Sequence, residues 1–333
     1  MSANDTLLQV TGLTKDYPAR HTFLGRKGGT IRAVDDVSFH IERGETLGLV
    51  GESGCGKTTT ARCILRAVEP TEGKILFHDG ESDVDVRALK GPALREFRKH
   101  MQLIFQDPYS SLNPRMTVRE IIGEPLIVHG VTGGSRLKER VRALMKQVGL
   151  DDRYLNRYPH AFSGGQRQRI GIARALALNP ALIVADEAVS ALDVSMQAQI
   201  INLLEELQEQ LHLTYLFIAH DLSVVRHFTN RVAVMYAGSV AEMGVSEDLF
   251  STPLHPYTAA LISSAPNPDP ERTQKRILLS DEVPDPGNMP SGCPFHPRCP
   301  FATDQCKSEK PALREITPGR FARCHFAGDL DLS

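Results

Sequence analysis

The sequence has no long apolar run, no excess of positive charge and no signal-peptide pattern in its first residues. None of its apolar runs approaches the roughly 20 residues needed to span a bilayer. Its 38 Lys and Arg residues are balanced by 40 Asp and Glu, and the net charge of −2 gives no hint of a nucleic-acid-binding surface. The first residues lack the charged and apolar regions of a signal peptide. We therefore expect a cytoplasmic protein that reaches a membrane only through partners.

The 333 residues allow roughly two domains, and a hydrophobic content of 41% is ample for a core. The six cysteines are unevenly placed. Two of them, Cys55 and Cys63, come early, and four crowd the end of the chain. In a reducing cytoplasm such clustering favours metal binding over disulfides. The late cysteines are Cys293, Cys299, Cys306 and Cys324.

Residues 51–58 read Gly-Glu-Ser-Gly-Cys-Gly-Lys-Thr and match the phosphate-loop pattern G-x-x-x-x-G-K-[ST]. An apolar run at 46–50 precedes them and a helical pattern at 58–67 follows, which is the strand–loop–helix context that the motif requires. Glycines let backbone N–H groups curl around phosphates, Lys57 reaches the β- and γ-phosphates, and Thr58 places its hydroxyl on Mg²⁺. The sequence therefore predicts that a nucleoside triphosphate binds here. The expected contacts are Gly51, Ser53, Gly54, Cys55, Gly56, Lys57, Thr58 and Thr59.

Four short apolar runs each end at a candidate functional residue. These runs are typical of strands buried on both faces of a parallel sheet, and ligands sit beyond the carboxyl ends of such strands. We expect all four residues at one edge of the sheet. The runs are 47–50, 103–105, 182–185 and 215–219, and the residues that follow them are Gly51, Gln106, Asp186 and His220.

The remaining segments have weaker patterns. Apolar spacing predicts amphipathic helices over 136–148 and 196–211, which we interpret as packing faces. Residues 5–45 alternate and turn, which indicates a small antiparallel sheet. Proline is dense from 253 to 318 and predicts a loop-rich extension with little regular structure.

Further motifs identify a family. Ser163-Gly-Gly-Gln166 opens a helical stretch, Ala185-Asp186-Glu187 follows an apolar run, and His220 lies downstream. Together with Tyr17 and Gln106, in this order and spacing, they resemble the motif set of ABC-transporter ATPases over roughly residues 6–250. The resemblance implies an α/β P-loop NTPase with a RecA-like core, an antiparallel β subdomain and a helical signature subdomain. We expect a nucleotide-binding domain at 1–250 and a Pro- and Cys-rich extension at 251–333.

The closer resemblance is to the ATPase subunits of dipeptide and oligopeptide (peptide/nickel) importers, and it covers nearly the whole chain. The segments that carry it are 51–57, 105–114, 158–169, 220–225, 255–258 and 292–300. Two residues depart from the general ABC pattern. Ala188 replaces a proline after the Glu187 position, and Phe162 replaces the leucine of the signature.

The resemblance implies a role for each motif residue. Lys57 and the loop backbone would hold the phosphates, Thr58 and Gln106 would bind Mg²⁺, and Asp186 would act through a Mg²⁺-bound water. Glu187 would polarise the attacking water, His220 would contact the γ-phosphate, and Tyr17 would stack on adenine. The signature would cap the γ-phosphate of a second subunit across a head-to-tail dimer interface, using Ser163, Gly164, Gly165 and Gln166.

The four late cysteines are spaced Cys293-x5-Cys299-x6-Cys306-x17-Cys324. Structural zinc usually takes tighter Cys-x2–4-Cys pairs, so this spacing favours a [4Fe–4S] cluster and leaves zinc as the alternative. The importer resemblance indicates a cluster as well. His296 and His325 could substitute as ligands, but we interpret them as surface residues. We expect a structural role for the metal.

The function implied is that of an ATP-hydrolysing, energy-coupling subunit of a bacterial importer. It would bind a second, paralogous ATPase, two membrane permeases and an extracytoplasmic solute-binding protein, at the cytoplasmic face of the membrane and without nucleic acid. Peptides, nickel complexes, opines and oligosaccharides all remain open as solutes. A soluble ABC protein of translation or repair is one alternative, although the chain has a single cassette and no room for a long coiled coil between Thr58 and Ser163. A purely metal-binding regulatory module is another, against which the intact Lys57, Glu187 and His220 speak.

Overall fold

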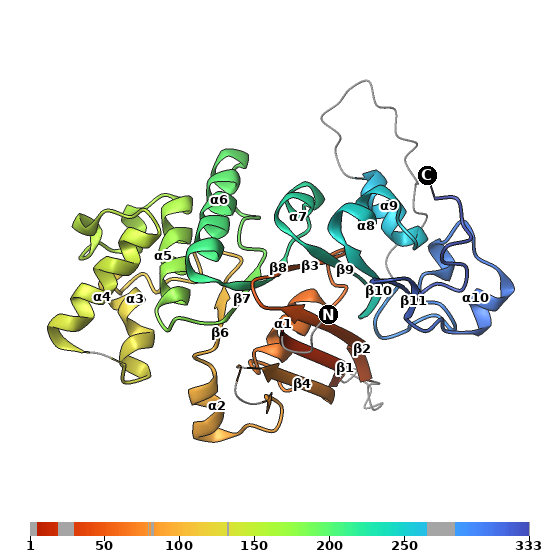
Figure 1. Cartoon of the computed structure of the whole chain (residues 1–333), viewed down its shortest axis with the longest axis horizontal. Helices are drawn as coiled ribbons and strands as arrows, with labels where there is room; N and C mark the ends of the chain where they lie inside the picture. Colours follow the sequence, from red (N-terminus) through yellow and green to blue (C-terminus); the bar gives the residue numbers. More distant parts are fainter. Residues whose placement is uncertain are drawn as a thin grey trace, which may run out of the picture. The chain divides into compact units, whose positions relative to one another are not determined.

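The computed structural model (Figure 1) describes residues 5–18, 30–78, 80, 83–131, 133–264 and 284–332. The chain divides into two compact units. The first unit comprises Met1–Asp5, Glu42–Thr46 and Ala88–Ile218. The second comprises Thr6–Ile41, Leu47–Arg87 and Ala219–Ser333. Both units combine helices with strands, as the predicted α/β class requires.

The first unit contains three parallel strands with β7 in the centre. Val184 of β7 pairs with Leu103 of β6 on one side and with Leu216 of β8 on the other. All residues of β7 and β8 are buried, which explains why these strands are continuous apolar runs. The runs predicted at 103–105, 182–185 and 215–219 are therefore confirmed as strands. The observed bounds are β6 (Met101–Ile104), β7 (Leu182–Asp186) and β8 (Thr214–Ile218).

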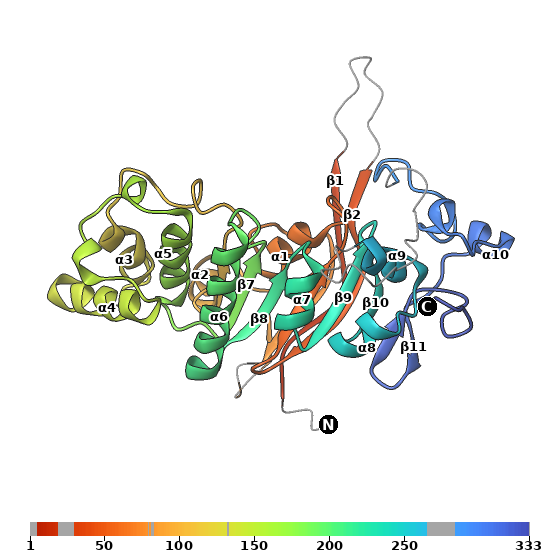
Figure 2. The same ribbon diagram turned by 90° about the horizontal axis from the view of Figure 1, so that it is seen from above.

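Five helices complete the first unit, and α3, α4 and α5 lie side by side in both views (Figures 1 and 2). Helix α4 buries Val141, Leu144 and Met145, so the amphipathic prediction for this segment is confirmed. The helices are α2 (Gly91–Phe97), α3 (Val118–Val128), α4 (Gly134–Gln147), α5 (Gly164–Leu176) and α6 (Val194–Leu211), with 3-10 turns at Asp152–Tyr154 and Pro159–Ala161.

The second unit contains a four-stranded sheet in the order β2-β1-β4-β5. Strand β4 is antiparallel to β1 and to β5. The antiparallel sheet expected from residues 5–45 is therefore present. The prediction was incomplete, because two of the four strands, β4 and β5, come after the phosphate loop in the sequence. Residues 19–29 of the predicted segment lie outside the described residues. Gly73 makes the pairing possible, since its φ is 97° and a Cβ there would lie 2.6 Å from the carbonyl oxygen of Gly12. The strands are β1 (Thr6–Pro18), β2 (Thr30–Glu42), β4 (Glu72–His78) and β5 (Asp83–Asp85).

A second group of strands in this unit runs in the order β11-β12-β10-β9-β3. Strand β3 is parallel to β9, and the other neighbouring pairs are antiparallel. The strands are β3 (Thr46–Val50), β9 (Arg231–Tyr236), β10 (Ser239–Val245), β11 (Arg314–Thr317) and β12 (Arg320–Ala322). The helices are α1 (Lys57–Ile64), α7 (Leu222–Phe228), α8 (Ser246–Ser251), α9 (Pro256–Ser264) and α10 (Asp304–Ser308), with a 3-10 turn at His296–Arg298.

The expectation of little regular structure in the extension is wrong for its described part. Helices α9 and α10 and strands β11 and β12 all fall within it or at its end. Proline density indicates loops, but it does not reveal that Ala322 of β12 pairs with Glu242 of β10. Just beyond β12, the N–H of Arg323 donates to the carbonyl of Ala241 at 2.7 Å. Residues 265–283 of the predicted loop-rich segment lie outside the described residues.

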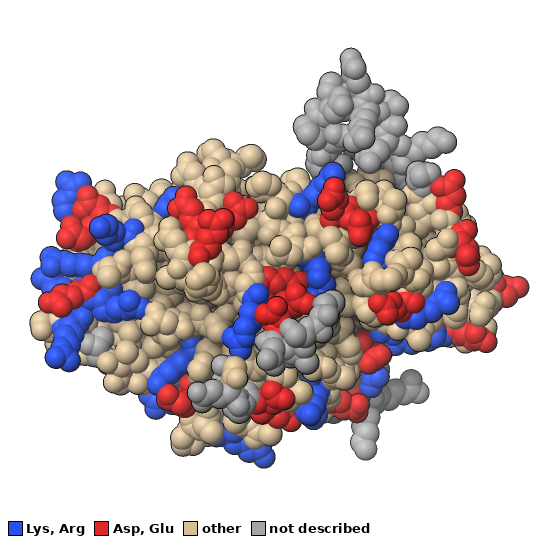
Figure 3. Space-filling model, viewed as in Figure 1, with Lys and Arg blue, Asp and Glu red and all other residues tan. Residues whose placement is uncertain are grey.

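Within the described ranges, no helix is both long enough and apolar enough to cross a membrane. On the face drawn in Figure 3, Lys and Arg side chains are interspersed with Asp and Glu.

Candidate nucleotide-binding site

The phosphate loop of the second unit joins β3 to α1, and two of its glycines are required by their surroundings. Gly51 has a φ of 147° and Gly56 a φ of 107°. A Cβ on Gly51 would lie 2.2 Å from the carbonyl oxygen of Met235, and one on Gly56 would lie 2.5 Å from that of Ala33. No side chain larger than hydrogen fits against backbone atoms at these distances, so the loop lies close against β2 and β9.

Lys57 is held inside the loop. Its side chain is buried, and Nζ donates to the carbonyl oxygens of Gly51 at 2.7 Å and Glu52 at 3.0 Å. It also lies 3.7 Å from Sγ of Cys55, a thiol whose pKa is raised by burial. The ammonium group is therefore held among carbonyl oxygens of the loop.

The other candidate residues of the second unit lie in the phosphate loop, in the first turn of α1 and near the end of β1. Ser53 and Gly54 are exposed, and Thr58 and Thr59 occupy the first turn of α1. Tyr17 is half-buried near the end of β1, with Nζ of Lys15 4.9 Å from the centre of its ring.

His220 is an exposed residue between the end of β8 and the start of α7. It belongs to the second unit together with the phosphate loop.

In the first unit, the structure brings Gln106 and Glu187 together. Nε2 of Gln106 donates to Oε2 of Glu187 at 2.6 Å. Gln106 follows β6, and Glu187 follows Asp186, the buried last residue of β7. The backbone of Glu187 is in the left-handed region, with a φ of 49°, and its N–H donates to the carbonyl of Ile218 at 2.9 Å. Backbone strain of this kind is often found at functional sites.

The signature segment forms the start of α5. Oγ of Ser163 accepts from the N–H of Gln166 at 3.3 Å, and Oε1 of Gln166 accepts from the N–H of Ser163 at 3.2 Å. This reciprocal pair is a capping box, and it fixes where the helix begins. Gly164 and Gly165 occupy the first turn, while Ser163 itself is exposed.

The predicted residues therefore fall into two groups. Lys57, Thr58, Tyr17 and His220 belong to the second unit with the phosphate loop, and Gln106, Asp186, Glu187 and the Ser163 segment belong to the first.

The four late cysteines line one cavity in the second unit. Its walls include Phe295, Phe301 and Phe326 as well as three histidines. The cysteines are Cys293, Cys299, Cys306 and Cys324, and the histidines are His255, His296 and His325.

Burial in the cavity raises the pKa of three of the cysteine thiols, Cys293, Cys299 and Cys324. Burial raises the pKa of Cys293 and of Cys299 to about 11, and the neighbouring cysteines push both values in the same direction. In the described part of the chain, however, no group of three or more His, Cys, Asp or Glu side chains is arranged to hold a metal ion. The structure thus gathers the predicted ligands around one space without closing them on a single point.

Sequence reasoning missed the residues that hold the phosphate loop from outside. The N–H of Glu52 donates to the hydroxyl of Tyr257 at 2.9 Å, and Arg298 donates to the Glu52 carboxylate at 2.7 and 3.0 Å. Tyr257 and Arg298 lie in the extension segments 255–258 and 292–300. The sequence of these segments indicated the family resemblance but not their contact with the phosphate loop.

Comparisons with known proteins identify the family of the chain. The family model described as ABC transporter matches residues 34–190, and the model described as oligopeptide/dipeptide transporter, C-terminal region, matches residues 241–306. The cysteine-lined cavity therefore lies partly within a segment that has its own family model.

Individual relatives match over almost the full length. The chain is 52% identical to the oligopeptide transport ATP-binding protein AppF of Bacillus subtilis, over 97% of this chain and 98% of that protein. It is 52% identical to a putative peptide import ATP-binding protein of Brucella ovis, over 96% and 97% of the two chains. Among solved structures, it is similar to the ATP-binding cassette MJ0796 in a dimeric post-hydrolysis state bound to ADP and Pi. The TM-score is 0.63 at 31% identity, covering 72% of this chain and 99% of that one. The chain belongs to the ABC transporter family and is one of its ATP-binding cassette ATPases.

Proposed function

We propose that this ATPase drives the import of di- or oligopeptides. The hydrogen bond of 2.6 Å between Gln106 and Glu187 carries the hydrolytic part of the proposal. It holds a carboxylate beside the amide side chain that follows a neighbouring strand, where an attacking water could be oriented. The names of the relatives from Bacillus subtilis and Brucella ovis favour peptides over the other solutes considered above.

Phosphoryl transfer depends mainly on positioning and on neutralising charge. We assign the phosphates to Lys57 and the backbone of 53–59, and adenine to Tyr17. Mg²⁺ would be held by Thr58 and Gln106, with Asp186 acting through a bound water, and would neutralise charge on the phosphates. Glu187 would polarise the attacking water and His220 would contact the γ-phosphate.

The signature would act on a second subunit. Ser163 at the start of α5 is exposed, and the N-terminus of a helix favours a phosphate group, which could come from a nucleotide on another chain. The relative MJ0796 was solved as a dimer. We infer a head-to-tail dimer, with a paralogous ATPase as the expected partner.

The remaining assembly is also part of the proposal. Two permeases would receive the conformational change through Gln106 and residues 107–125, and an extracytoplasmic binding protein would deliver the peptide. This ATPase would then sit peripherally on the cytoplasmic face of the membrane. Recovery of permease subunits with the tagged chain, from membranes of its own cell, tests this assignment against a soluble role in translation or repair.

Glu187→Gln tests the hydrolytic role. We expect ATP to bind with unchanged affinity, steady-state turnover in the assembled transporter to fall by about 100-fold or more, and the closed dimer to accumulate. Glu209→Gln is the matched control, because Glu209 is an exposed residue of α6 in the same unit. Unchanged ATPase activity of Glu187→Gln in the complex would refute the assignment.

We further propose that the cysteine-lined cavity holds a [4Fe–4S] cluster. The proposal is supported by the four cysteines that line this one cavity, since a [4Fe–4S] cluster takes four thiolate ligands, and by their spacing, which is looser than that of structural zinc sites. Once bound, a cluster supplies iron–thiolate bonds that tie the extension together.

Metal analysis tests the cluster. The full-length protein purified without oxygen should be brown and contain about four irons per chain. Cys306→Ser should lose most of the iron, whereas Cys63→Ser should keep it, because Cys63 lies on α1 and does not line the cavity. Colourless, iron-free protein contradicts the proposal, and one zinc per chain would establish the alternative.

A further inference from the structure

One residue of the phosphate loop, Glu52, is held from three directions within the second unit. Its N–H donates to the hydroxyl of Tyr257 at 2.9 Å, and its carbonyl accepts from Nζ of Lys57 at 3.0 Å. Its carboxylate receives two hydrogen bonds from Arg298, at 2.7 and 3.0 Å. Glu52 therefore connects the lysine of the loop to two segments of the extension.

Arg298 is fixed as firmly as its partner. Only 6% of its side chain is exposed, and its guanidinium also donates to the hydroxyl of Tyr236 at 3.5 Å. The aromatic ring of Phe295 lies 5.2 Å from that of Tyr236 and 5.5 Å from that of Tyr257, centre to centre. A planar guanidinium that binds a carboxylate through two bonds is both strong and directional.

The sequence position of Arg298 links it to the cysteine-lined cavity. It directly precedes Cys299 and ends the 3-10 turn that begins shortly after Cys293. Both cysteines line the cavity, as does Phe295. Arg298 therefore belongs to the same short segment as two cysteines and one phenylalanine of the cavity.

The charge of Glu52 makes this contact relevant to ATP. A carboxylate at the second position of the loop would repel an incoming triphosphate and would compete with it for the ammonium of Lys57. Pairing with Arg298 cancels the charge and fixes the carboxylate in a bidentate contact. The phosphates then contact only the lysine side chain and the backbone N–H groups of the loop.

We propose that Arg298 is a positioning residue for ATP binding, which neutralises and fixes Glu52 and so couples the cysteine-lined extension to nucleotide affinity. The inference rests on the proposed function, since it takes residues 51–58 as the triphosphate site.

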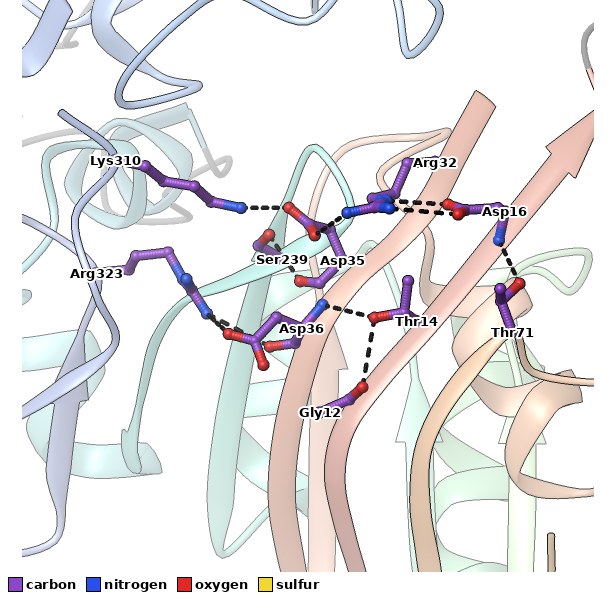
Figure 4. A network of polar contacts seen from close by, with 10 residues as sticks. All are labelled: Gly12, Thr14, Asp16, Arg32, Asp35, Asp36, Thr71, Ser239, Lys310 and Arg323. Atoms are coloured by element: carbon purple, nitrogen blue, oxygen red, sulfur yellow. Dashed lines mark hydrogen bonds and ion pairs between the residues drawn. The ribbon is translucent and has the colours of Figure 1, made fainter. Parts of the chain in front are cut away.

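A second buried arginine of the extension provides a matched control. Arg323 is buried like Arg298, but its side chain donates to the carbonyl of Val240 at 3.0 Å and reaches Asp36. Figure 4 shows this contact beside the ion pair of Lys310 with Asp35. Both contacts join the extension to β2 and neither involves the phosphate loop.

The experiment measures ATP affinity and the KM and kcat of hydrolysis for the full-length protein in its complex. Arg298→Met should weaken ATP binding about tenfold, because it leaves the Glu52 carboxylate unpaired beside the triphosphate, and should raise KM with kcat unchanged. Arg298→Lys keeps the charge and should lose about threefold. Arg323→Met should leave affinity unchanged. Metal content should be the same in every variant.

Removal of the carboxylate separates charge neutralisation from mere anchoring. Glu52→Gln should bind ATP at least as tightly as the native protein, and Glu52→Gln combined with Arg298→Met should restore affinity to within about twofold. Equal weakening by Glu52→Gln and Arg298→Met, or no effect of Arg298→Met on affinity, overturns the proposal. If Arg298→Met does not fold, the ATP affinities of Arg298→Lys and Glu52→Gln still decide between charge neutralisation and mere anchoring. Failure of the native protein to bind ATP would instead refute the proposed function.

Discussion

Helices α1 and α5 both begin with glycines where we expect phosphates to bind, yet their starts are built differently. Gly56, the N-cap of α1, has a φ of 107° and no side-chain cap, and its conformation is imposed by the backbone of Ala33. The start of α5 is closed by its own capping box between Ser163 and Gln166. The phosphate loop therefore depends on the tertiary structure around it. The signature is fixed locally and can be offered to another molecule.

Glycine-to-alanine substitutions should separate the two starts most strongly. Gly56→Ala should lower the free energy of unfolding by about 3 kcal/mol, because it adds the strain of a positive φ to a contact with a backbone oxygen. Gly164→Ala should change it by less than about 1 kcal/mol, since the added Cβ would meet only side-chain atoms, the nearest 3.3 Å away on Leu192. Urea denaturation of both variants measures the difference.

Similar losses of unfolding free energy at Gly56 and Gly164 would show that the two helix starts do not differ in how they are fixed. The proposed function adds a second readout, because Gly164→Ala should still reduce turnover of the assembled transporter if the start of α5 contacts the nucleotide of the partner subunit.

The capping box gives a smaller effect. Ser163→Ala should cost about 1 kcal/mol of stability, because the N–H of Gln166 loses its acceptor. Ser53→Ala in the phosphate loop should change stability by less than about 0.5 kcal/mol, since Ser53 is exposed. The same denaturation measurement decides. A larger loss from Ser53→Ala than from Ser163→Ala would show that the two serines had been assigned the wrong roles in folding.

Thiol reactivity sharpens the contrast without disturbing the fold. Burial raises the pKa of Cys55, so little of it is thiolate at pH 8 and its alkylation should be slow, rising as pH increases. A cysteine placed by Ser163→Cys would lie at an exposed helix N-terminus, where the pKa of a thiol falls, and should react faster. Peptide mass spectrometry after brief alkylation at pH 8 compares the two sites. Comparable rates would indicate that the phosphate loop is more open than the structure shows.

Much of the site could be predicted because its signals are local. The strands at 46–50, 101–104, 182–186 and 214–218 overlap the apolar runs at 47–50, 103–105, 182–185 and 215–219, and each of these runs is followed by its candidate residue. The capping box is visible as Ser163 and Gln166, three positions apart. The roles of these residues in ATP chemistry remain predictions.

The extension was harder to predict because its order depends on contacts that are distant in sequence. Arg298 and Glu52 are 246 positions apart, and nothing in the spacing of either segment shows that they meet. Strand β12 is three residues long and is stabilised by β10, far upstream. Proline density predicted little regular structure and carried no information about the pairing that gives the described part of the extension its helices and strands.

Strand β12 also protects the edge of strand β10 from pairing with another chain. It occupies one side of β10, whose residues are almost all buried. Proteolytic trimming before residue 314 would strip that side and leave β10 as a bare sheet edge, able to recruit a strand from another copy. Loss of the tail would therefore lead to aggregation of the ATPase even where its nucleotide pocket remained intact.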